Sequence, residues 1–111
     1  WSIITTIKYT QTPTSIKQEI VNYPKEYSLS QNYPNPFNPS TTLQFAVPQA
    51  GPVSLRVYDM LGREVSILVN ERKNAGSYEV KFDASGLASG VYFYRLQAGE
   101  YTATRRLLLL R

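Results

Sequence analysis

The 111-residue sequence contains no cysteine and no histidine. Without cysteine the chain has no disulfide and no thiolate nucleophile, and without histidine it has no imidazole for proton transfer or metal binding. Catalysis would therefore require paired carboxylates or a serine–lysine arrangement. No glycine-rich phosphate loop follows a strand and opens a helix, so nucleotide binding has no support either.

Long apolar runs and clustered charge are also missing. The run Leu107–Leu110 is far shorter than the ~20 apolar residues that cross a bilayer as a helix, so we expect no membrane span. The net charge is +4, and most of its basic residues are scattered rather than gathered in a stripe. Such a distribution argues against a nucleic-acid partner. Because the sequence begins with Trp1, we expect a processed chain or a piece of a longer one.

The sequence instead contains short segments in which apolar and polar residues alternate, separated by turn residues. In Val53–Asp59, for example, Val53, Leu55 and Val57 share one face. Strands of this length with regular turns predict an all-β fold, a seven-stranded antiparallel β-sandwich. The expected strands are Tyr27–Asn32, Thr42–Val47, Val53–Asp59, Glu64–Val69, Gly76–Asp83, Val91–Gln97 and Tyr101–Leu110, with Asn70–Ala75 as a polar loop.

The N-terminal part differs in texture from the rest. Trp1–Tyr9 is rich in β-branched and aromatic residues and reads as an extra strand, whereas Thr10–Tyr27 is polar and lacks a strong period. We therefore divide the chain into a strand that belongs to a preceding domain or to an assembly (1–10), a linker (11–26) and the sandwich domain (27–111).

Glycine and aspartate mark the turns between the expected strands. Asp59-Met60-Leu61-Gly62-Arg63 predicts a tight hairpin in which Gly62 has a positive φ. Asp59 and Asp83 each follow a strand, where aspartate caps turns with its side chain. The residues that we expect to determine the turns are Asp59, Gly62, Gly76, Asp83, Gly90 and Gly99.

The run from Tyr33 to Thr42 is the most unusual local feature. Its three prolines fix φ and remove backbone donors, which excludes both a helix and a central strand. We expect a rigid loop in which Asn35 and Asn38 form Asx-turns and Phe37, the one large apolar residue of Pro34–Pro39, is buried as an anchor. An alternative use of this loop is a calcium site, because Asn35, Asn38 and Asp59 could supply oxygen ligands if the loop lay near the hairpin.

The last expected strand has two apolar faces at its end. By strand periodicity Leu107 and Leu109 point one way, and Leu108 and Leu110 point the other. A two-layer sandwich buries one of these faces. The second face therefore needs a cover, which the linker, Trp1–Tyr9 or another protein would provide.

Several motifs, in order along the chain, resemble the C-terminal sorting domain of the type IX secretion system, type A. Leu29–Thr41 resembles its opening signature, and Tyr58–Val65 resembles its middle hairpin. Gly76–Tyr78 and Phe82–Leu96 resemble its late motifs, and Arg105–Arg111 resembles its basic and apolar terminal strand. The resemblance extends from Tyr27 to Arg111.

The resemblance implies an Ig-like sandwich without catalytic, cofactor-binding or metal-binding residues, and an address that an outer-membrane translocon reads. It implies export through the periplasm to the cell surface or medium of a Bacteroidetes-type bacterium, and processing by a sortase-like peptidase. The implied recognition residues are Tyr33, Pro34, Asn35, Pro36, Phe37, Asn38, Pro39, Arg105, Arg106, Leu107, Leu108, Leu109, Leu110 and Arg111.

Two other functions fit the same residues. An uncleaved Ig-like unit could assemble with copies of itself into a filament or matrix if Trp1–Tyr9 added to a sheet edge of a neighbour. Exposed tyrosines could also stack on sugars, although most of the nine tyrosines alternate in expected strands and are more simply explained as core.

Overall fold

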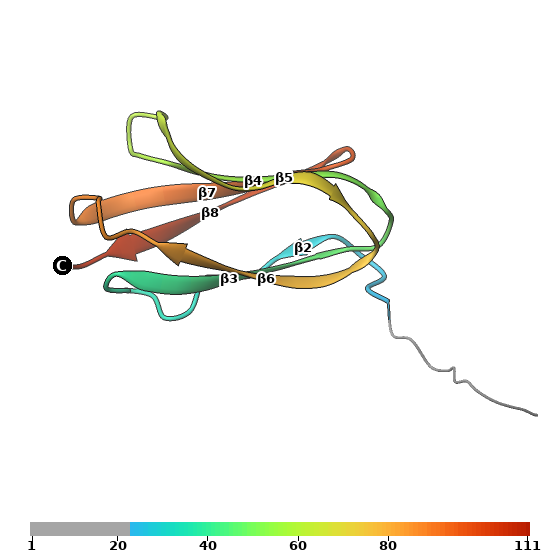
Figure 1. Ribbon diagram of the computed structural model, residues 1–111, viewed down its shortest axis with the longest axis horizontal. Coiled ribbons are helices and arrows are strands. Elements are labelled where there is room, and N and C mark those ends of the chain that lie inside the picture. The colour runs from blue at the N-terminus through green and yellow to red at the C-terminus, as the bar shows by residue number, and fades with distance from the viewer. Residues whose placement is uncertain (1–22) are drawn as a thin grey trace, which may run out of the picture.

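A computed structural model describes residues 23–111, so the expected strand Trp1–Tyr9 and most of the linker lie outside the described residues. The described chain is an all-β sandwich of two layers (Figure 1), as the alternating pattern predicted. One sheet has the order β2-β3-β6 and the other the order β5-β4-β7-β8. The strands are β2 (Ser28–Leu29), β3 (Ser40–Val47), β4 (Gly51–Tyr58), β5 (Glu64–Lys73), β6 (Gly76–Asp83), β7 (Gly90–Ala98) and β8 (Tyr101–Leu109).

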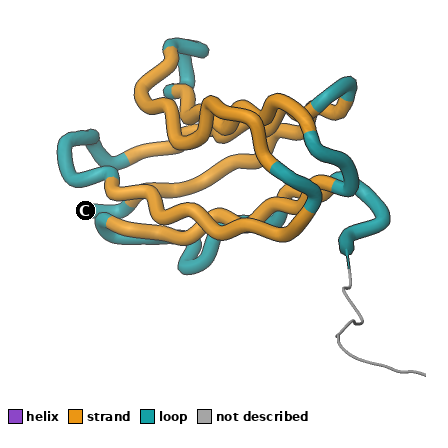
Figure 2. The backbone as a smooth tube through the Cα atoms, turned by 45° about the vertical axis from the view of Figure 1, so that its right-hand side comes forward, coloured by secondary structure: helices purple, strands orange, loops and turns teal. Residues whose placement is uncertain are grey.

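All paired strands are antiparallel, and their alternation places one face of each sheet against the other sheet. In β4 the buried face is formed by Val53, Leu55 and Val57, as their spacing predicted. Figure 2 shows the two layers edge-on with loops at both ends of the sandwich. The largest fully buried side chains are Tyr94, Leu43, Leu55, Leu96, Leu107, Leu109, Val47 and Val57.

Two expected strand ends were wrong by three or four residues, whereas the other strand boundaries differ by at most two. The first strand was expected at Tyr27–Asn32, but only Ser28–Leu29 pairs as a strand, because the chain then turns to build the proline loop. The segment after Val69 was expected to be a loop, yet β5 continues to Lys73. It can do so because β4 begins at Gly51, so that Pro52 lies opposite Arg72. Pro52 lies beyond the reach of β7, which pairs with β4 from Val53 onward, and its missing donor interrupts no second ladder.

The hairpin between β4 and β5 has the expected turn. Gly62 has a φ of 83°, which is the left-handed region that glycine enters at least cost. The Asp59 carboxylate accepts hydrogen bonds from the backbone N–H groups of Leu61 and Arg63, both at 2.9 Å, and from the Arg63 side chain at 2.8 Å. The hydrogen bond from the Arg63 backbone is the main reason that the pKa of Asp59 lies below its ordinary value of 3.8.

The turn between β7 and β8 fixes the start of the last strand. Gly99 has a φ of 60°, and a Cβ placed there would lie 3.2 Å from the Tyr27 hydroxyl. The Tyr27 ring stacks on Tyr101 with 5.1 Å between centroids. These contacts hold the beginning of the described chain against the β7–β8 turn. Within residues 23–111 the structure has no helix of the length and apolarity needed to cross a membrane.

Candidate functional site: the proline loop and the terminal strand

A buried polar cluster shapes the base of the proline loop, residues 33–39. Asn32 is 2% exposed, and its side-chain amide donates to the Pro34 carbonyl and to the Thr41 hydroxyl, both at 3.0 Å. The Thr41 hydroxyl in turn donates to the Pro34 carbonyl at 2.8 Å. The backbones of Tyr33 and Thr42 exchange two hydrogen bonds across the same base. Asn32 and Thr41 thus close the loop with groups that would be costly to leave unpaired.

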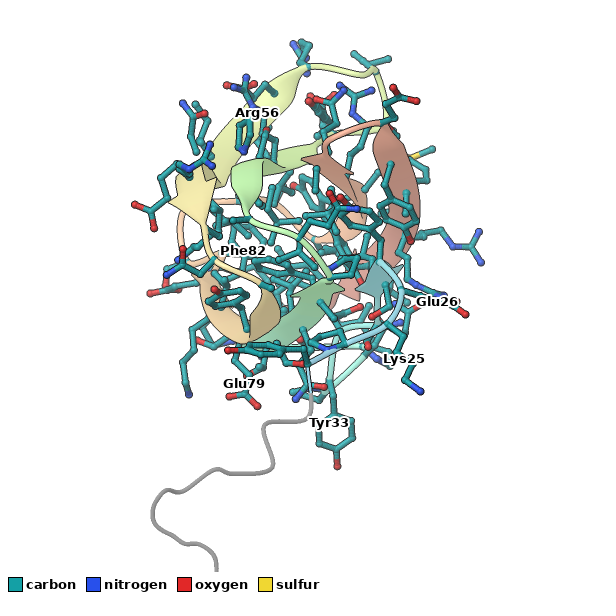
Figure 3. All side chains as sticks on the ribbon, turned by 90° about the vertical axis from the view of Figure 1, so that its right-hand side faces the viewer. Lys25, Glu26, Tyr33, Arg56, Glu79 and Phe82 are labelled. Carbon is teal, nitrogen blue, oxygen red and sulfur yellow. The ribbon has the colours of Figure 1, made fainter. Side chains whose placement is uncertain are left out.

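Phe37 anchors the tip of the loop in the core, as its isolation among polar residues predicted. Its side chain is 2% exposed and packs against Phe82 of β6, with ring centroids 6.1 Å apart. Figure 3 shows Phe82 between the two layers, whereas Tyr33 projects into solvent. All three X-Pro peptide bonds of the loop are cis. Burial of Phe37 holds the rest of the loop along the outside of the sandwich.

The tip of the loop lies along the edge of β8 that is not paired with β7. Phe37 and Leu109 form a parallel β-bridge, in which the Phe37 N–H donates to the Leu108 carbonyl and the Leu110 N–H donates to the Phe37 carbonyl, both at 3.0 Å. The Asn35 side-chain oxygen accepts from the Leu108 N–H, also at 3.0 Å. Asn35 was expected to form a local Asx-turn, but its side-chain oxygen instead accepts a hydrogen bond from Leu108, which is 73 residues away in the sequence.

Residues before the loop continue the same contact toward the start of β8. The Arg105 Nε donates to the Leu29 carbonyl at 2.6 Å, and the Gln31 side chain donates to the Arg106 carbonyl at 2.7 Å. Together, residues 29–37 and β8 form a seam that joins the two sheets at one edge of the sandwich. An unpaired strand edge is open to pairing with other chains, and the seam closes this edge of β8 over Arg106–Leu110.

Tyr94 supports the seam from beneath. Its side chain is fully buried, and its hydroxyl donates to the Ser30 carbonyl at 2.6 Å. Burial raises the pKa of the Tyr94 hydroxyl above its ordinary value of 10.0. The phenol therefore remains a donor at physiological pH and links β7 to the segment that precedes the proline loop.

The end of the chain is held by the loop between β6 and β7. The Arg111 guanidinium donates to the carbonyls of Ala84, Ser85 and Leu87, and the Arg111 N–H donates to the Ser89 hydroxyl at 2.9 Å. Within the same loop the Ser85 hydroxyl and N–H donate to the Asp83 carboxylate, and these bonds lower the pKa of Asp83. Arg111, which the sequence marked as a recognition residue, is thus also a structural contact.

The structure brings the proline loop and the terminal strand, the two predicted recognition segments, into contact. Some of their residues are buried, however, and others are exposed. Leu107 and Leu109 are fully buried, so a partner that meets the folded domain cannot contact them. Tyr33 is 81% exposed, Leu110 is 50% exposed and Arg106 is also exposed. On the terminal strand, the face that carries Arg106, Leu108 and Leu110 is accessible, and Arg105 on the opposite face is exposed as well. Whether a partner reads these residues stays a prediction.

Asn32 and Thr41 lie within the signature-like segment Leu29–Thr41, but neither they nor Tyr94 were expected among the recognition residues, and their hydrogen bonds were not predicted. Asn32 and Thr41 flank the prolines at nearly equal distance on either side, and this symmetry is the only sequence signal for their pairing. The conditional calcium site has no geometric support, because the Asn35 acceptor is used by Leu108 and the Asp59 carboxylate by Leu61 and Arg63. Residues 23–111 contain no group of three or more acidic, histidine or cysteine side chains placed to hold a metal ion.

The family model described as "Secretion system C-terminal sorting domain" matches residues 31–110, a stretch that includes both sides of the seam. The chain belongs to this family. Its role is therefore that of a type IX sorting signal, which targets a protein for secretion. Domains of this family are in general non-catalytic.

Among solved structures, the sandwich is similar to part of the crystal structure of dimeric latent PorU from Porphyromonas gingivalis. The TM-score is 0.57 and the sequence identity is 17%, over 82% of this chain and 10% of the PorU chain. The chain thus spans about a tenth of that protein, and at this identity the likeness concerns the fold alone. No curated protein matches the sequence.

Proposed function

We propose that this chain directs a protein attached to its N-terminal side through the type IX outer-membrane translocon, and that the seam is the surface that the machinery reads. The observation that carries this proposal is the pairing of Phe37 with Leu109. It makes the proline loop and the terminal strand one folded surface rather than two separate peptides. The chain performs no chemistry in this role, and its partners are translocon components.

The domain boundaries belong to the same proposal. Residues 27–111 form the sorting domain, residues 11–26 act as a linker and residues 1–10 belong to what precedes it. Tyr27 supports this start, because its ring is the first to pack against the sandwich among the described residues, on Tyr101. The family match from residue 31 to residue 110 lies within the proposed domain. The destination is the cell surface or the medium, reached through the periplasm, with a sortase-like peptidase as a further partner at the surface.

The proposal is tested by fusing the full chain to the C-terminus of a periplasmic reporter in a bacterium with a working type IX system. We expect the reporter in the medium or on the surface with the intact chain, and in the periplasm after deletion of Leu107–Arg111. That deletion also removes two buried leucines, so Asn35→Ala serves as a gentler variant that removes one acceptor of the seam. Asn70→Ala on exposed β5 is the matched control. Equal secretion with and without Leu107–Arg111 would contradict the proposal.

A second function is supported by the sheet edges. β5 and β6 lie at the edges of their sheets, whereas the edge of β8 is occupied by the proline loop and the remaining edge strand, β2, has only 2 residues. A strand from a neighbouring copy, such as Trp1–Tyr9, would therefore find its acceptor at β5 or β6 and build a surface assembly by strand addition. Removal of Trp1–Thr10 separates the two functions, because sorting should survive and assembly should not. Light scattering of the purified chain with and without these residues measures the second effect.

A further inference from the structure

The outward face of the four-stranded sheet collects arginine and aromatic side chains in rows across the strands. Tyr58 of β4 lies opposite Phe93 of β7, which lies opposite Arg106 of β8. One row along, Arg56 lies opposite Arg95. We use the name arginine–aromatic face for the surface formed by Arg56, Tyr58, Phe93, Arg95, Arg106 and Leu108. Its residues are half-buried or exposed.

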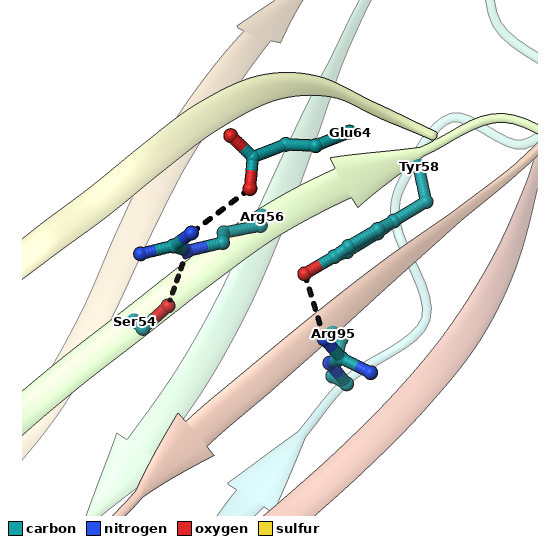
Figure 4. Close-up of polar contacts among 5 residues, drawn as sticks. All are labelled: Ser54, Arg56, Tyr58, Glu64 and Arg95. Atoms are coloured by element: carbon teal, nitrogen blue, oxygen red, sulfur yellow. Dashed lines mark hydrogen bonds and ion pairs between the residues drawn. The ribbon is translucent and has the colours of Figure 1, made fainter. Parts of the chain in front are cut away.

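Two arginines at directly opposed positions of neighbouring strands are an unfavourable pair, because like charges there repel. Figure 4 shows how each is accommodated. Arg56 donates to the Ser54 hydroxyl and to Glu64, both at 2.9 Å. Arg95 stacks over the Tyr58 ring, 4.7 Å from its centroid, and donates to the Tyr58 hydroxyl at 2.8 Å. The buried Arg95 Nε has no hydrogen-bond partner among the described residues.

The positive charge of this face is poorly balanced. β7 and β8 place Arg95 and Arg106 on this face and contain no acidic residue. Arg95 and Arg106 form no ion pair with any residue in the range 23–111, and Glu64 is already engaged by Arg56. The outward face of the other sheet is different, because Glu79 and Lys81 of β6 have opposite signs and Gln44 donates to Glu79 at 2.8 Å.

These features specify the chemistry of an occupant. The backbones of β4 and β7 are paired on both sides, so binding here occurs through side chains and not by strand addition. Arginine matches the geometry of carboxylates, and tyrosine and arginine are enriched among the residues that dominate protein–protein binding energy. Aromatic and aliphatic groups beside the guanidinium groups suit a protein surface better than a purely ionic polymer.

We propose that the arginine–aromatic face docks an acidic surface of a partner protein, with carboxylates on Arg95 and Arg106 and apolar side chains on Phe93 and Leu108. The inference rests on the proposed function, since the partner would be a component that receives the exported protein. Beyond the proposed function, the inference specifies which face of the domain binds the partner, the sign of the partner's charge and the residues that contact the partner.

The cellular test uses the reporter fusion with the full chain and two matched pairs of surface variants. Arg106→Glu is paired with Lys81→Glu, and Thr104→Glu beside Arg95 is paired with Ser77→Glu on β6; all four residues are exposed. We expect secretion to fall at least tenfold for Arg106→Glu and Thr104→Glu and to stay within twofold for the controls. If the unmodified chain is secreted and all four variants are secreted equally, the docking inference is overturned while the proposed function stands.

A binding measurement keeps the inference testable if the reporter is not secreted at all, a result that would count against the proposed function. The purified 111-residue chain is titrated by NMR with a peptide that alternates glutamate and leucine, with its glutamine counterpart and with dextran sulfate. We expect the acidic peptide to perturb β4, β7 and β8, and to lose at least tenfold in affinity with Arg106→Glu but not with Lys81→Glu. Binding to dextran sulfate alone, or perturbation of β3 and β6 instead, overturns it. Circular dichroism and the melting temperature confirm that each variant is folded.

Discussion

Phe37 and Leu109 are 72 residues apart in the sequence but lie side by side as a parallel bridge, whereas the named strands of residues 23–111 pair antiparallel. Both side chains point into the core, where Phe37 is 2% exposed and Leu109 is fully buried. The bridge closes the gap between the two sheets where β8 would otherwise have a free edge. A change on one side of this pair is therefore expected to affect the other side.

Replacement of Phe37 by alanine tests the anchor. A fully enclosed phenylalanine contributes apolar burial and fills space that alanine leaves empty, so Phe37→Ala should lower the free energy of unfolding by about 3–5 kcal/mol. Urea unfolding of the purified chain measures the loss. Tyr33→Ala in the same loop is the control, since that ring is 81% exposed and its removal should cost little. A loss below about 1 kcal/mol for Phe37→Ala would show that the loop is a surface tether.

Tyr94→Phe tests the support beneath the seam. The substitution keeps the ring but removes the hydroxyl that donates to Ser30, and leaves that carbonyl without its partner. We expect a loss of about 1 kcal/mol in urea unfolding, because the only change is the loss of one hydrogen bond made by a buried phenol. Tyr58→Phe is the comparison. The Tyr58 hydroxyl accepts a hydrogen bond from Arg95 on the outward face of the four-stranded sheet, so its removal should lower the free energy of unfolding by less. Equal losses for the two variants would contradict this view of the seam.

Much of the sandwich could be predicted because alternation is a local signal. Leu43, Phe45 and Val47 share a face of β3 by spacing alone, and that face is buried. Burial of Phe37 was also predictable, since no other large apolar side chain lies between Pro34 and Pro39. In these cases residues within one segment decide the outcome.

The seam could not be predicted in the same way, because its hydrogen bonds depend on tertiary contacts. Asn35 can satisfy its side-chain oxygen locally or with a distant N–H, and only the docking of β8 decides in favour of Leu108. The continuation of β5 to Lys73 has a similar origin, since it requires β4 to begin at Gly51. Polar residues such as Asn70 and Arg72 carry a loop signal that pairing with a neighbouring strand overrides.

Gly62→Val tests the hairpin. Gly62 has a φ of 83° and open space around its Cα, so the cost of a side chain there is conformational rather than a clash. A β-branched residue in this region should lower the free energy of unfolding by about 1–3 kcal/mol. Gly86→Val is the control, because Gly86 also has open space but no positive φ in that range. The claim is lost if both variants melt at the same temperature.

The Asp59 carboxylate predicts how the hairpin responds to acid. Its hydrogen bonds hold the pKa in the folded state below the ordinary value of 3.8, so the folded protein binds fewer protons than the unfolded chain and stability rises with pH. The contribution should be complete above about pH 5 and should disappear as the pH falls through the lowered pKa. Urea midpoints at pH 2–7 for the native chain and Asp59→Asn measure it. The difference between the two should shrink in acid, and a difference that stays constant from pH 2 to pH 7 would contradict this role of Asp59.

The two faces of the terminal strand should separate folding from recognition. Leu107 and Leu109 are fully buried, whereas Leu108 is half-buried and Leu110 is 50% exposed on the outward face. The double substitution of Leu108 and Leu110 by serine should therefore leave the chain folded, with a cooperative urea transition, but reduce secretion of an attached reporter severalfold. Substitution of Leu107 and Leu109 by serine should instead unfold the domain, because each change removes core contacts and buries a hydroxyl. If the Leu108 and Leu110 double substitution unfolds the chain, the outward face is part of the core. If it leaves secretion per folded molecule unchanged, no partner reads that face. Either result would contradict the distinction between the two faces.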